Sequence, residues 1–260
     1  AQEGVGMRLV DTNVHLSRWP FRRVANDDTA GLARKLKQLK ITEAWAGSFD
    51  ALLHRDLSAV NGSLVEECRR HGEGILKPFG SVNLSLPDWE EDARRCAKVY
   101  RMKGIRLYPN YHQYELEDPR FRKLLVMAAD WGLIVQIAVM MEEERTQHPL
   151  MQLAHVNPAP LIGLLKEIPK ARIVLQNCFR AVRGGLLLKL QATRRVWFDI
   201  STLEGMAGIE RMLQQLPMDR LVLGSHAPFY IPESALLKLK ESRLTDAQFN
   251  AISFKNAQTI

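Results

Sequence analysis

The sequence contains few cysteines, and they show no pairing or metal-binding pattern. Cys68, Cys96 and Cys178 form an odd number, and no Cys-x-x-Cys pair is present. A disulfide scaffold is therefore excluded, and a structural zinc site gains no support. No apolar stretch approaches the roughly 18 residues that would span a bilayer. Because a basic and apolar leader segment is also missing, we expect a cytoplasmic protein, with a signal peptide already removed as the alternative.

The sequence also lacks concentrated charge. Lys and Arg number 36 against 29 for Asp and Glu, which gives a net charge of +7. The basic residues are scattered among acidic and apolar ones, without a zinc finger, an aromatic RNA-binding motif or a basic arm. We therefore expect neither a nucleic-acid nor a membrane partner. A small anionic substrate would be attracted by the positive charge, and pairing of barrels into a homo-oligomer stays open.

Short apolar runs alternate with amphipathic ones along the whole chain. The runs are rich in Val, Ile and Leu, as in strands that are buried on both faces. We expect eight strands, at residues 8–10, 43–46, 76–82, 104–107, 133–139, 172–175, 196–200 and 220–223. Helical patterns lie between them, at residues 29–39, 88–99, 119–131, 159–168 and 205–216. The number of strands and their alternation with helices predict an α/β fold, a single (β/α)₈ TIM barrel.

Local signals support this organisation. Asp28, Asp88 and Asp118 stand where helix N-caps are expected, and Gly104 stands where a helix is expected to end. The rival fold, an open doubly wound sheet, usually has a glycine-rich loop after its first strand, whereas this chain reads DTNVH there. No linker or internal repeat is visible. We expect a linker or processed end at residues 1–7 and one barrel domain at residues 8–260.

The barrel prediction indicates where chemistry would occur. In such barrels the active site lies at the C-terminal ends of the strands and in the loops that follow. Trp19 and Phe21 are expected to pack a rim loop over this end. The polar residues that fall at these ends are Asn13, His15, Ser48, Asp50, Asn83, Arg106, Tyr108, Asn110, Gln136, Glu142, Arg145, His148, Asn177, Cys178, Arg180, Asp199, Ser201, Ser225 and His226.

Four short segments of the sequence resemble a known family. The sequences VDTNVHLSRWPFRR, KGIRLYPNYHQY, GSHAPF and FKNAQTI are similar to those of the amidohydrolase-related (amidohydrolase 2) branch of the amidohydrolase superfamily. The similarity extends over residues 9–260. It implies a TIM barrel, and many members of that branch are metal-dependent hydrolases or decarboxylases.

The resemblance also implies five metal-site positions, and this chain departs from the family at four of them. The family has two histidines after the first strand, one after the fifth, one after the sixth, and an aspartate after the eighth. In this sequence those positions hold Asn13, His15, Gln136, Asn177 and His226. Amide oxygens are poor ligands for zinc, which prefers imidazole, thiolate or carboxylate. We therefore expect no resident cofactor, with zinc held by His15 and His226 as the alternative.

The first functional hypothesis is hydrolysis of a small anionic lactone or cyclic ester without a tightly bound metal, as in the lactone-hydrolysing relatives. His226 would activate water as a general base, and His15 would orient His226 or donate to the leaving oxygen. Arg106 would stabilise negative charge. Further side chains would bind the substrate: Asn13, Tyr108, Gln136, Arg145, His148, Asn177 and Arg180.

Two other hypotheses stay open. The chain could be a metal-dependent amidohydrolase or decarboxylase with a depleted metal site, or a barrel that binds a ligand without catalysis. The residues also have structural interpretations: His15 and His226 as hydrogen-bonded groups that plug the barrel mouth, Arg145 as the partner of a nearby glutamate. Cys178 is expected to be a buried inert thiol in preference to a nucleophile paired with His226.

Overall fold

The fold is an α/β barrel of eight parallel strands. The computed structural model describes residues 8–260, so the segment expected as a linker at residues 1–7 lies outside it. Three strands form one sheet and five form a second. Isolated parallel bridges, Gly80 with Ile105 and Val14 with Ala227, join the two sheets on both sides. The strands are β1 (Val10–Leu16), β2 (Glu43–Ser48), β3 (Leu76–Pro78), β4 (Gly104–Leu107), β5 (Ile134–Ala138), β6 (Ile173–Gln176), β7 (Val196–Asp199) and β8 (Leu221–Val222).

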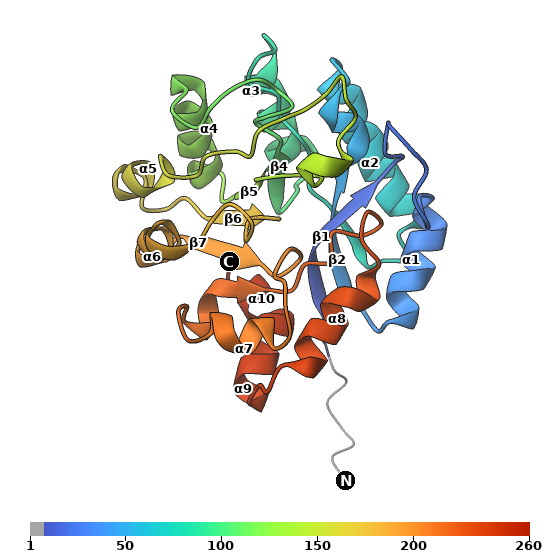
Figure 1. Cartoon of the computed structure of the whole chain (residues 1–260). Helices are drawn as coiled ribbons and strands as arrows, with labels where there is room; N and C mark the ends of the chain where they lie inside the picture. The colour runs from blue at the N-terminus through green and yellow to red at the C-terminus, as the bar shows by residue number, and fades with distance from the viewer. Residues whose placement is uncertain (1–7) are drawn as a thin grey trace.

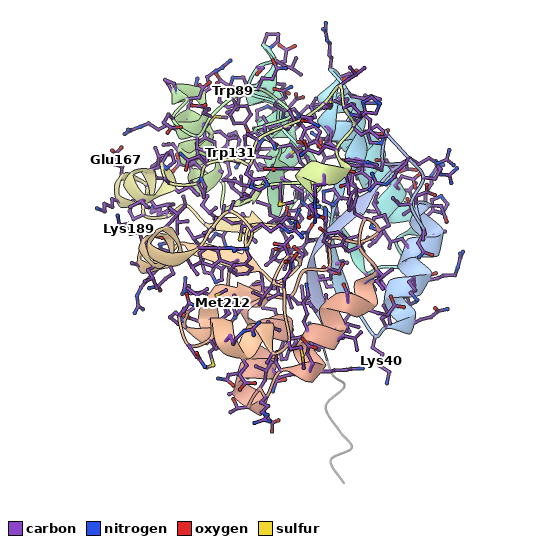
Figure 2. All side chains as sticks on the ribbon, viewed as in Figure 1. Lys40, Trp89, Trp131, Glu167, Lys189 and Met212 are labelled. Atoms are coloured by element: carbon purple, nitrogen blue, oxygen red, sulfur yellow. The ribbon has the colours of Figure 1, made fainter. Side chains whose placement is uncertain are left out.

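Helices surround the strands in chain order (Figure 1). Their apolar faces cover the outside of the sheets, and the charged residues labelled in Figure 2, such as Lys40, Glu167 and Lys189, are exposed. None of the helices in residues 8–260 is long and apolar enough to cross a bilayer. The helices are α1 (Thr29–Gln38), α2 (Leu57–His71), α3 (Trp89–Arg94), α4 (Pro119–Asp130), α5 (Leu161–Glu167), α6 (Gly184–Ala192), α7 (Gly208–Met212), α8 (Pro232–Glu241), α9 (Asp246–Asn250) and α10 (Asn256–Thr259), with short 3₁₀ or π segments at Phe49–Leu52, Arg95–Val99, Glu144–Thr146, Met218–Arg220 and Ala251–Lys255.

Three layers of side chains fill the inside of the barrel. The N-terminal end is apolar and is packed against the chain's last residues, with a core that includes Trp45, Phe79, Trp197 and Ile260. The C-terminal end carries an aromatic cluster around Trp19, which also includes Phe49 and Tyr108. Between them lies a polar layer with buried charges. The candidate site is this middle layer together with the aromatic cluster above it.

The barrel and most of its elements agree with the expectations from the sequence. Asp28 and Asp118 cap α1 and α4 through side-chain hydrogen bonds, because each carboxylate accepts a backbone N–H of the first helical turn. The strand at residues 104–107 has the expected bounds.

Three local expectations were wrong or incomplete. The first strand was expected at residues 8–10, but it begins at Val10 and extends to Leu16, because its polar residues belong to the buried polar layer. Gly104 does not end a helix. It lies in β4, where a Cβ atom would stand 2.3 Å from the Ile134 carbonyl oxygen. Helix α2, with 15 residues, had no expected counterpart, since its short polar residues obscure the apolar period.

Candidate functional site

Arg106, on β4, lies at the centre of the polar layer and is fully buried. Its Nε donates to Gln136 Oε1 at 2.9 Å, and its Nη1 lies 3.4 Å from His15 Nε2. Its other contacts, at 2.6–3.3 Å, are to backbone carbonyls, those of Val14, Trp45 and Thr12. Burial lowers the pKa of Arg106, but a guanidinium stays charged in proteins. These five contacts engage its five N–H groups, so it has none left to bind a substrate carboxylate directly.

His15, on β1, is also fully buried and stacks on Phe49, with ring centroids 4.7 Å apart. Its Nε2 lies 3.0 Å from the Tyr108 hydroxyl, besides facing Arg106. Because arginine can only donate, Nε2 carries the lone pair and Nδ1 carries the hydrogen. Within residues 8–260 this Nδ1 has no hydrogen-bond partner. Burial, and then the charge of Arg106, hold the pKa of His15 well below its usual value, so the ring is neutral at pH 7.

His226, four residues beyond the end of β8, is the second buried imidazole. Its ring centroid lies 5.5 Å from that of His15, at a nearly perpendicular angle. Its Nε2 donates to the Met141 carbonyl at 2.8 Å, which leaves the lone pair on Nδ1, 3.5 Å from Asn177 Nδ2. Burial lowers the pKa of His226 to about 4. The neutral ring matches the state that a general base needs, but Asn177 covers its basic nitrogen.

A chain of hydrogen bonds joins the middle of β1 to the ends of β6 and β7. Asn13 Nδ2 donates to Asn177 Oδ1 at 2.8 Å and to Asp199 Oδ2 at 2.6 Å. The other carboxylate oxygen of Asp199 accepts from the Asn177 backbone N–H at 3.0 Å and from the Ser201 hydroxyl at 2.9 Å. Gln136 belongs to the same layer, with its Nε2 donating to the Thr12 carbonyl at 2.8 Å. Amide groups therefore bind one another and Asp199 in this site.

Aromatic rings cover both histidines. Trp19, which is 2% exposed, lies between Phe49 and Phe229, with ring centroids 5.2 and 5.1 Å away. Phe49 stacks on His15, as described, and Phe229 stacks on His226 at 5.1 Å. We call Trp19, Phe49 and Phe229 the aromatic plug. The expectation that the loop around Trp19 packs over the barrel is confirmed, and in this arrangement the plug closes the mouth above the histidines.

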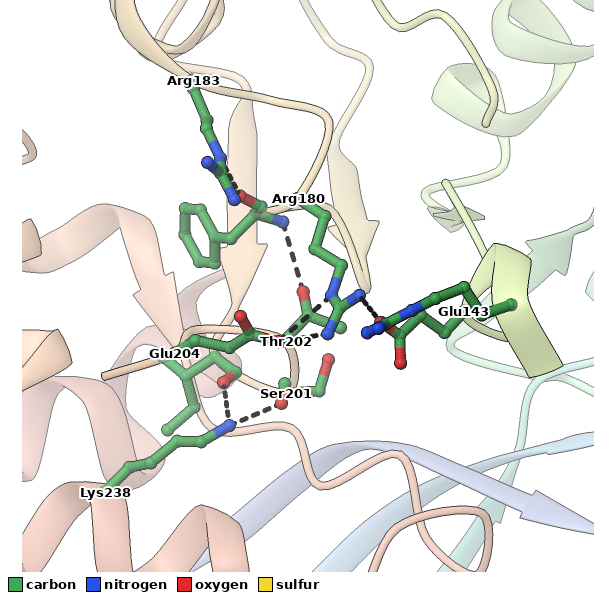
Figure 3. Close-up of polar contacts among 10 residues, drawn as sticks. Glu143, Arg180, Arg183, Ser201, Thr202, Glu204 and Lys238 are labelled. Carbon is green, nitrogen blue, oxygen red and sulfur yellow. Dashed lines mark hydrogen bonds and ion pairs between the residues drawn. The ribbon is translucent and has the colours of Figure 1, made fainter. Parts of the chain in front are cut away.

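Three of the residues expected to bind substrate lie outside this buried group. The Arg145 side chain is 85% exposed and pairs with Glu143 at 2.6 Å. Arg180 Nη1 pairs with Glu143 at 2.6 Å as well, and its Nη2 pairs with Glu204. Figure 3 shows Glu143, Arg180 and Glu204 beside Lys238, whose Nζ donates to the carbonyls of Ile200 and Ser201. The exposed His148 stacks on Phe21, with ring centroids 5.5 Å apart.

Arg145 and Arg180, at the rim of the barrel, are paired with glutamates, so they are less able to bind an anionic substrate. Hydrogen bonds from Arg145 and Arg180 hold the pKa of Glu143 at about 2. A cavity of about 480 Å³ lies beside Arg180 and is lined by acidic as well as basic groups, among them Glu204 and Lys238. The rim is therefore a balanced ion-pair network, and the roles assigned to these residues from the sequence stay predictions.

The structure thus brings together seven of the ten residues singled out from the sequence, in one buried group: Asn13, His15, Arg106, Tyr108, Gln136, Asn177 and His226. Two further members of this group, Phe49 and the Met141 carbonyl, had no signal in the sequence, since neither apolar rings nor backbone atoms form a motif. Asp199 was visible as a strand-end residue, but its central position was not. Burial raises the pKa of Cys178 well above its usual value, as expected for an inert thiol.

The metal ion implied by the resemblance does not fit these residues. Within the described chain no group of three or more His, Cys, Asp or Glu side chains converges as a metal ligand set would. His15 Nε2 and Gln136 Oε1 accept from Arg106, and Asn177 Oδ1 accepts from Asn13 and Ser201. Asn13 Oδ1 has no hydrogen-bond partner within residues 8–260, but a single amide oxygen is a weak ligand for zinc. Because the other ligand atoms face protein donors, and one donor is itself a cation, the side chains lack a set of free ligand atoms.

Comparison with known proteins identifies the family. The amidohydrolase family model matches residues 10–260, so the chain belongs to this family, as its sequence motifs indicated. No curated protein sequence matches the chain.

Several solved structures share the fold. A 5-carboxyvanillate decarboxylase from Sphingomonas paucimobilis has a TM-score of 0.77 at 13% identity, over 97% of this chain and 98% of that one. A 2,6-dihydroxybenzoate decarboxylase from Rhizobium has a TM-score of 0.74 at 13% identity, over 98% of both chains. A dihydroxybenzoic acid decarboxylase from a Polaromonas species, with bound manganese and the inhibitor 2-nitroresorcinol, has a TM-score of 0.75 at 11% identity, over 96% of both chains.

Proposed function

We propose that this chain is a decarboxylase of small aromatic carboxylates in which buried side chains take the place of a metal site. The observation that carries the proposal is the aromatic plug, which stands directly above two neutral imidazoles and a buried guanidinium. Flat apolar walls over donors and a positive charge suit an aromatic anion. The three relatives described as decarboxylases act on aromatic acids and supply the substrate class. Lactone hydrolysis, the first hypothesis from the sequence, gains no support from them.

Substrate binding would require Trp19 to move out. An aromatic ring could then occupy the position of the indole, between Phe49 and Phe229. The unpartnered Nδ1–H of His15 would donate to an oxygen of the substrate, and Arg106 would attract the carboxylate through its charge, without direct hydrogen bonds. Tyr108 and Gln136 would hold His15 and Arg106 in place.

The reaction would begin with proton uptake by a histidine. A bound carboxylate favours the charged form of a neighbouring imidazole and thus raises its pKa. The resulting imidazolium of His15 would transfer its proton to the ring carbon that bears the carboxylate. The bond between that carbon and the carboxylate would then break, its electron pair would return to the ring, and CO₂ would leave. One proton is consumed for each CO₂, so the buried histidine must be reprotonated from solvent in each cycle.

One observation favours a second candidate, a barrel that binds the same anions without catalysis. Every N–H of Arg106 is engaged, the basic nitrogen of His226 faces Asn177, and Trp19 occupies the mouth. A site whose groups already satisfy one another can bind a ligand by displacing the plug and still lack a reactive base or acid.

The test compares binding with turnover on metal-stripped protein. Thermal shift with 2,6-dihydroxybenzoate and 5-carboxyvanillate measures binding, and trapped CO₂ measures decarboxylation. The variant His15→Gln removes the titrating nitrogen, and Arg34→Met, on the exposed face of α1, serves as the matched control. We expect CO₂ release by the wild type and the control, and a loss of at least about 100-fold in His15→Gln, as for a general acid.

Each other outcome decides between the candidates. Binding without CO₂ release by any form would favour the non-catalytic barrel. Turnover that appears only after manganese or zinc is added would contradict the metal-free chemistry. If neither acid binds, the proposal that the substrates are small aromatic carboxylates is wrong.

A further inference from the structure

We propose that Arg106 is the resident cation of this barrel and that its guanidinium keeps a divalent metal ion out of the polar layer. This inference concerns the ground state of the protein and holds whichever reaction the chain performs. It rests on the geometry of five hydrogen bonds and on the direction in which the neighbouring polar atoms point.

The first step of the argument is the position of the guanidinium. Arg106 extends from β4 across the barrel axis and contacts β1, β2 and β5. A fully buried arginine is rare unless its charge is met by acceptors. Here three carbonyl oxygens and one amide oxygen meet it, which are the kinds of ligand that a hard cation takes in proteins. The site is thus built to hold a positive charge, and the chain supplies that charge itself.

The second step is charge balance. Two carboxyl groups of the same polar layer, Asp11 and Asp199, are fully buried, and each interacts with the guanidinium. Asp199 is bound by Asn13 and Ser201, and the Asp11 carboxylate accepts the backbone N–H of Ser225 at 2.9 Å. Both carboxyls are therefore already held by protein donors. A divalent ion would have to bind beside a permanent positive charge with no free carboxylate to offset it.

The third step concerns the five positions that the resemblance assigns to a metal. Two of them, His15 and Gln136, present their acceptor atoms to Arg106. Asn177 Oδ1 accepts from Asn13, and the basic nitrogen of His226 faces the Asn177 amide. Of the five positions, Asn13 alone presents an acceptor, its Oδ1, that has no hydrogen-bond partner within residues 8–260. Metal binding would need these hydrogen bonds to break together. The substitutions in the sequence and the buried arginine are thus parts of one arrangement, in which a fixed guanidinium replaces an exchangeable ion.

Metal titration of the intact chain is the first test. The protein is first stripped of metal with a chelator, and its Tm is measured with and without 1 mM manganese or zinc. In a separate folded sample, the metal that stays bound after gel filtration is measured by elemental analysis. A site with a Kd near 10 μM would raise Tm by about 5–10 °C under these conditions. We expect the Tm to shift by less than about 1 °C, which corresponds to a negligible stabilisation by metal. We also expect much less than one metal ion to remain bound per chain. A shift of several degrees with one metal per chain would overturn the proposal.

Two variants separate charge from packing. Arg106→Met removes the charge and keeps the length, and Arg106→Lys restores the charge with fewer donors. We expect a large loss of Tm in Arg106→Met and recovery of a measurable part of it in Arg106→Lys, whereas Arg34→Met, on the surface of α1, should match the wild type. Metal uptake by folded Arg106→Met that is absent in Arg106→Lys would support exclusion by charge. Equal losses of Tm in both Arg106 variants, or metal uptake by Arg106→Lys, would contradict it.

Discussion

Asn177 and His226 both adopt positive φ, +54° and +60°, and this conformation turns the chain sharply after β6 and near the end of β8. Non-glycine residues rarely occupy the left-handed region, although asparagine and histidine do so more readily than most. The turns bring both side chains into the polar layer, where they meet each other and Asn13. At this scale the site depends on backbone conformation as much as on residue type.

The first prediction concerns His226. Replacement by alanine should lower the free energy of unfolding by about 2–4 kcal/mol, because a buried ring and its hydrogen bond to the Met141 carbonyl are lost. His226→Asn should be the milder change by about 1 kcal/mol, since asparagine tolerates positive φ better than alanine. Urea unfolding of the two variants measures the difference. Equal stabilities would show that the backbone conformation contributes nothing.

Residue identity and position could predict which side chains lie close together, but not which groups they form hydrogen bonds with. His15, Arg106 and His226 were found from their positions at strand ends, and they do meet. Their hydrogen-bond partners are largely backbone carbonyls, which leave no trace in a sequence. Arg106 was therefore expected to stabilise negative charge during the reaction, whereas its N–H groups are engaged by the protein.

The segment between β1 and α1 acts as one unit at the scale of elements. It carries Trp19 into the aromatic plug and Arg22 to the buried carboxylate of Glu142, beyond β5. The indole N–H of Trp19 has no hydrogen-bond partner within residues 8–260, which costs stability in the closed position. Besides ring packing and this ion pair, the segment is held by hydrogen bonds of the Ser17 hydroxyl with Ser48 and the Asp50 backbone N–H, close to β1. We therefore expect the part around Trp19 to be where the mouth opens.

Removal of the Trp19 side chain should therefore open a cavity that accepts an added ring. We expect Trp19→Ala to lose about 3–5 kcal/mol of stability, as for a buried aromatic residue. Added indole should raise the Tm of this variant and leave the wild type unchanged, because apolar cavities of this size bind aromatic molecules. Trp131→Ala, at the half-buried end of α4, is the control. Indole that stabilises neither variant, or both equally, would contradict a specific slot above the histidines.

For the whole molecule, alternating apolar runs and helix caps were enough to predict a single barrel. Eight strands recur in the expected order, because buried parallel strands need Val, Ile and Leu whatever the function. What could not be predicted is the polar layer, since its residues interrupt the apolar pattern of β1 and belong to strands far apart in the chain. The same layer places several titrating groups out of contact with water, so the stability of the whole fold should depend on pH.

A buried titrating group outside this layer shows the effect most clearly: His112, between β4 and α4, donates from its Nε2 to the Ala51 carbonyl at 2.8 Å. Burial lowers its pKa from 6.5 to about 4. For a histidine with a depressed pKa, the stabilisation is full above pH 6.5 and is lost as pH falls toward 4. Asp11 acts in the opposite direction, because burial raises its pKa from 3.8 to about 6, so that it favours the folded state as pH falls. The wild-type curve alone therefore mixes opposing contributions.

A variant isolates the contribution of His112. His112→Gln keeps a donor for the Ala51 carbonyl but does not titrate, so the difference between wild type and variant cancels the other groups. We expect the free energy of unfolding of the wild type, relative to the variant, to fall by about 3 kcal/mol between pH 7 and pH 4. Urea unfolding at closely spaced pH values measures it, with His54→Gln, an exposed histidine, as the control. Parallel curves for wild type and His112→Gln would mean that His112 takes up its proton in the folded protein without opening the contact with Ala51, and that burial at this position is incomplete in solution.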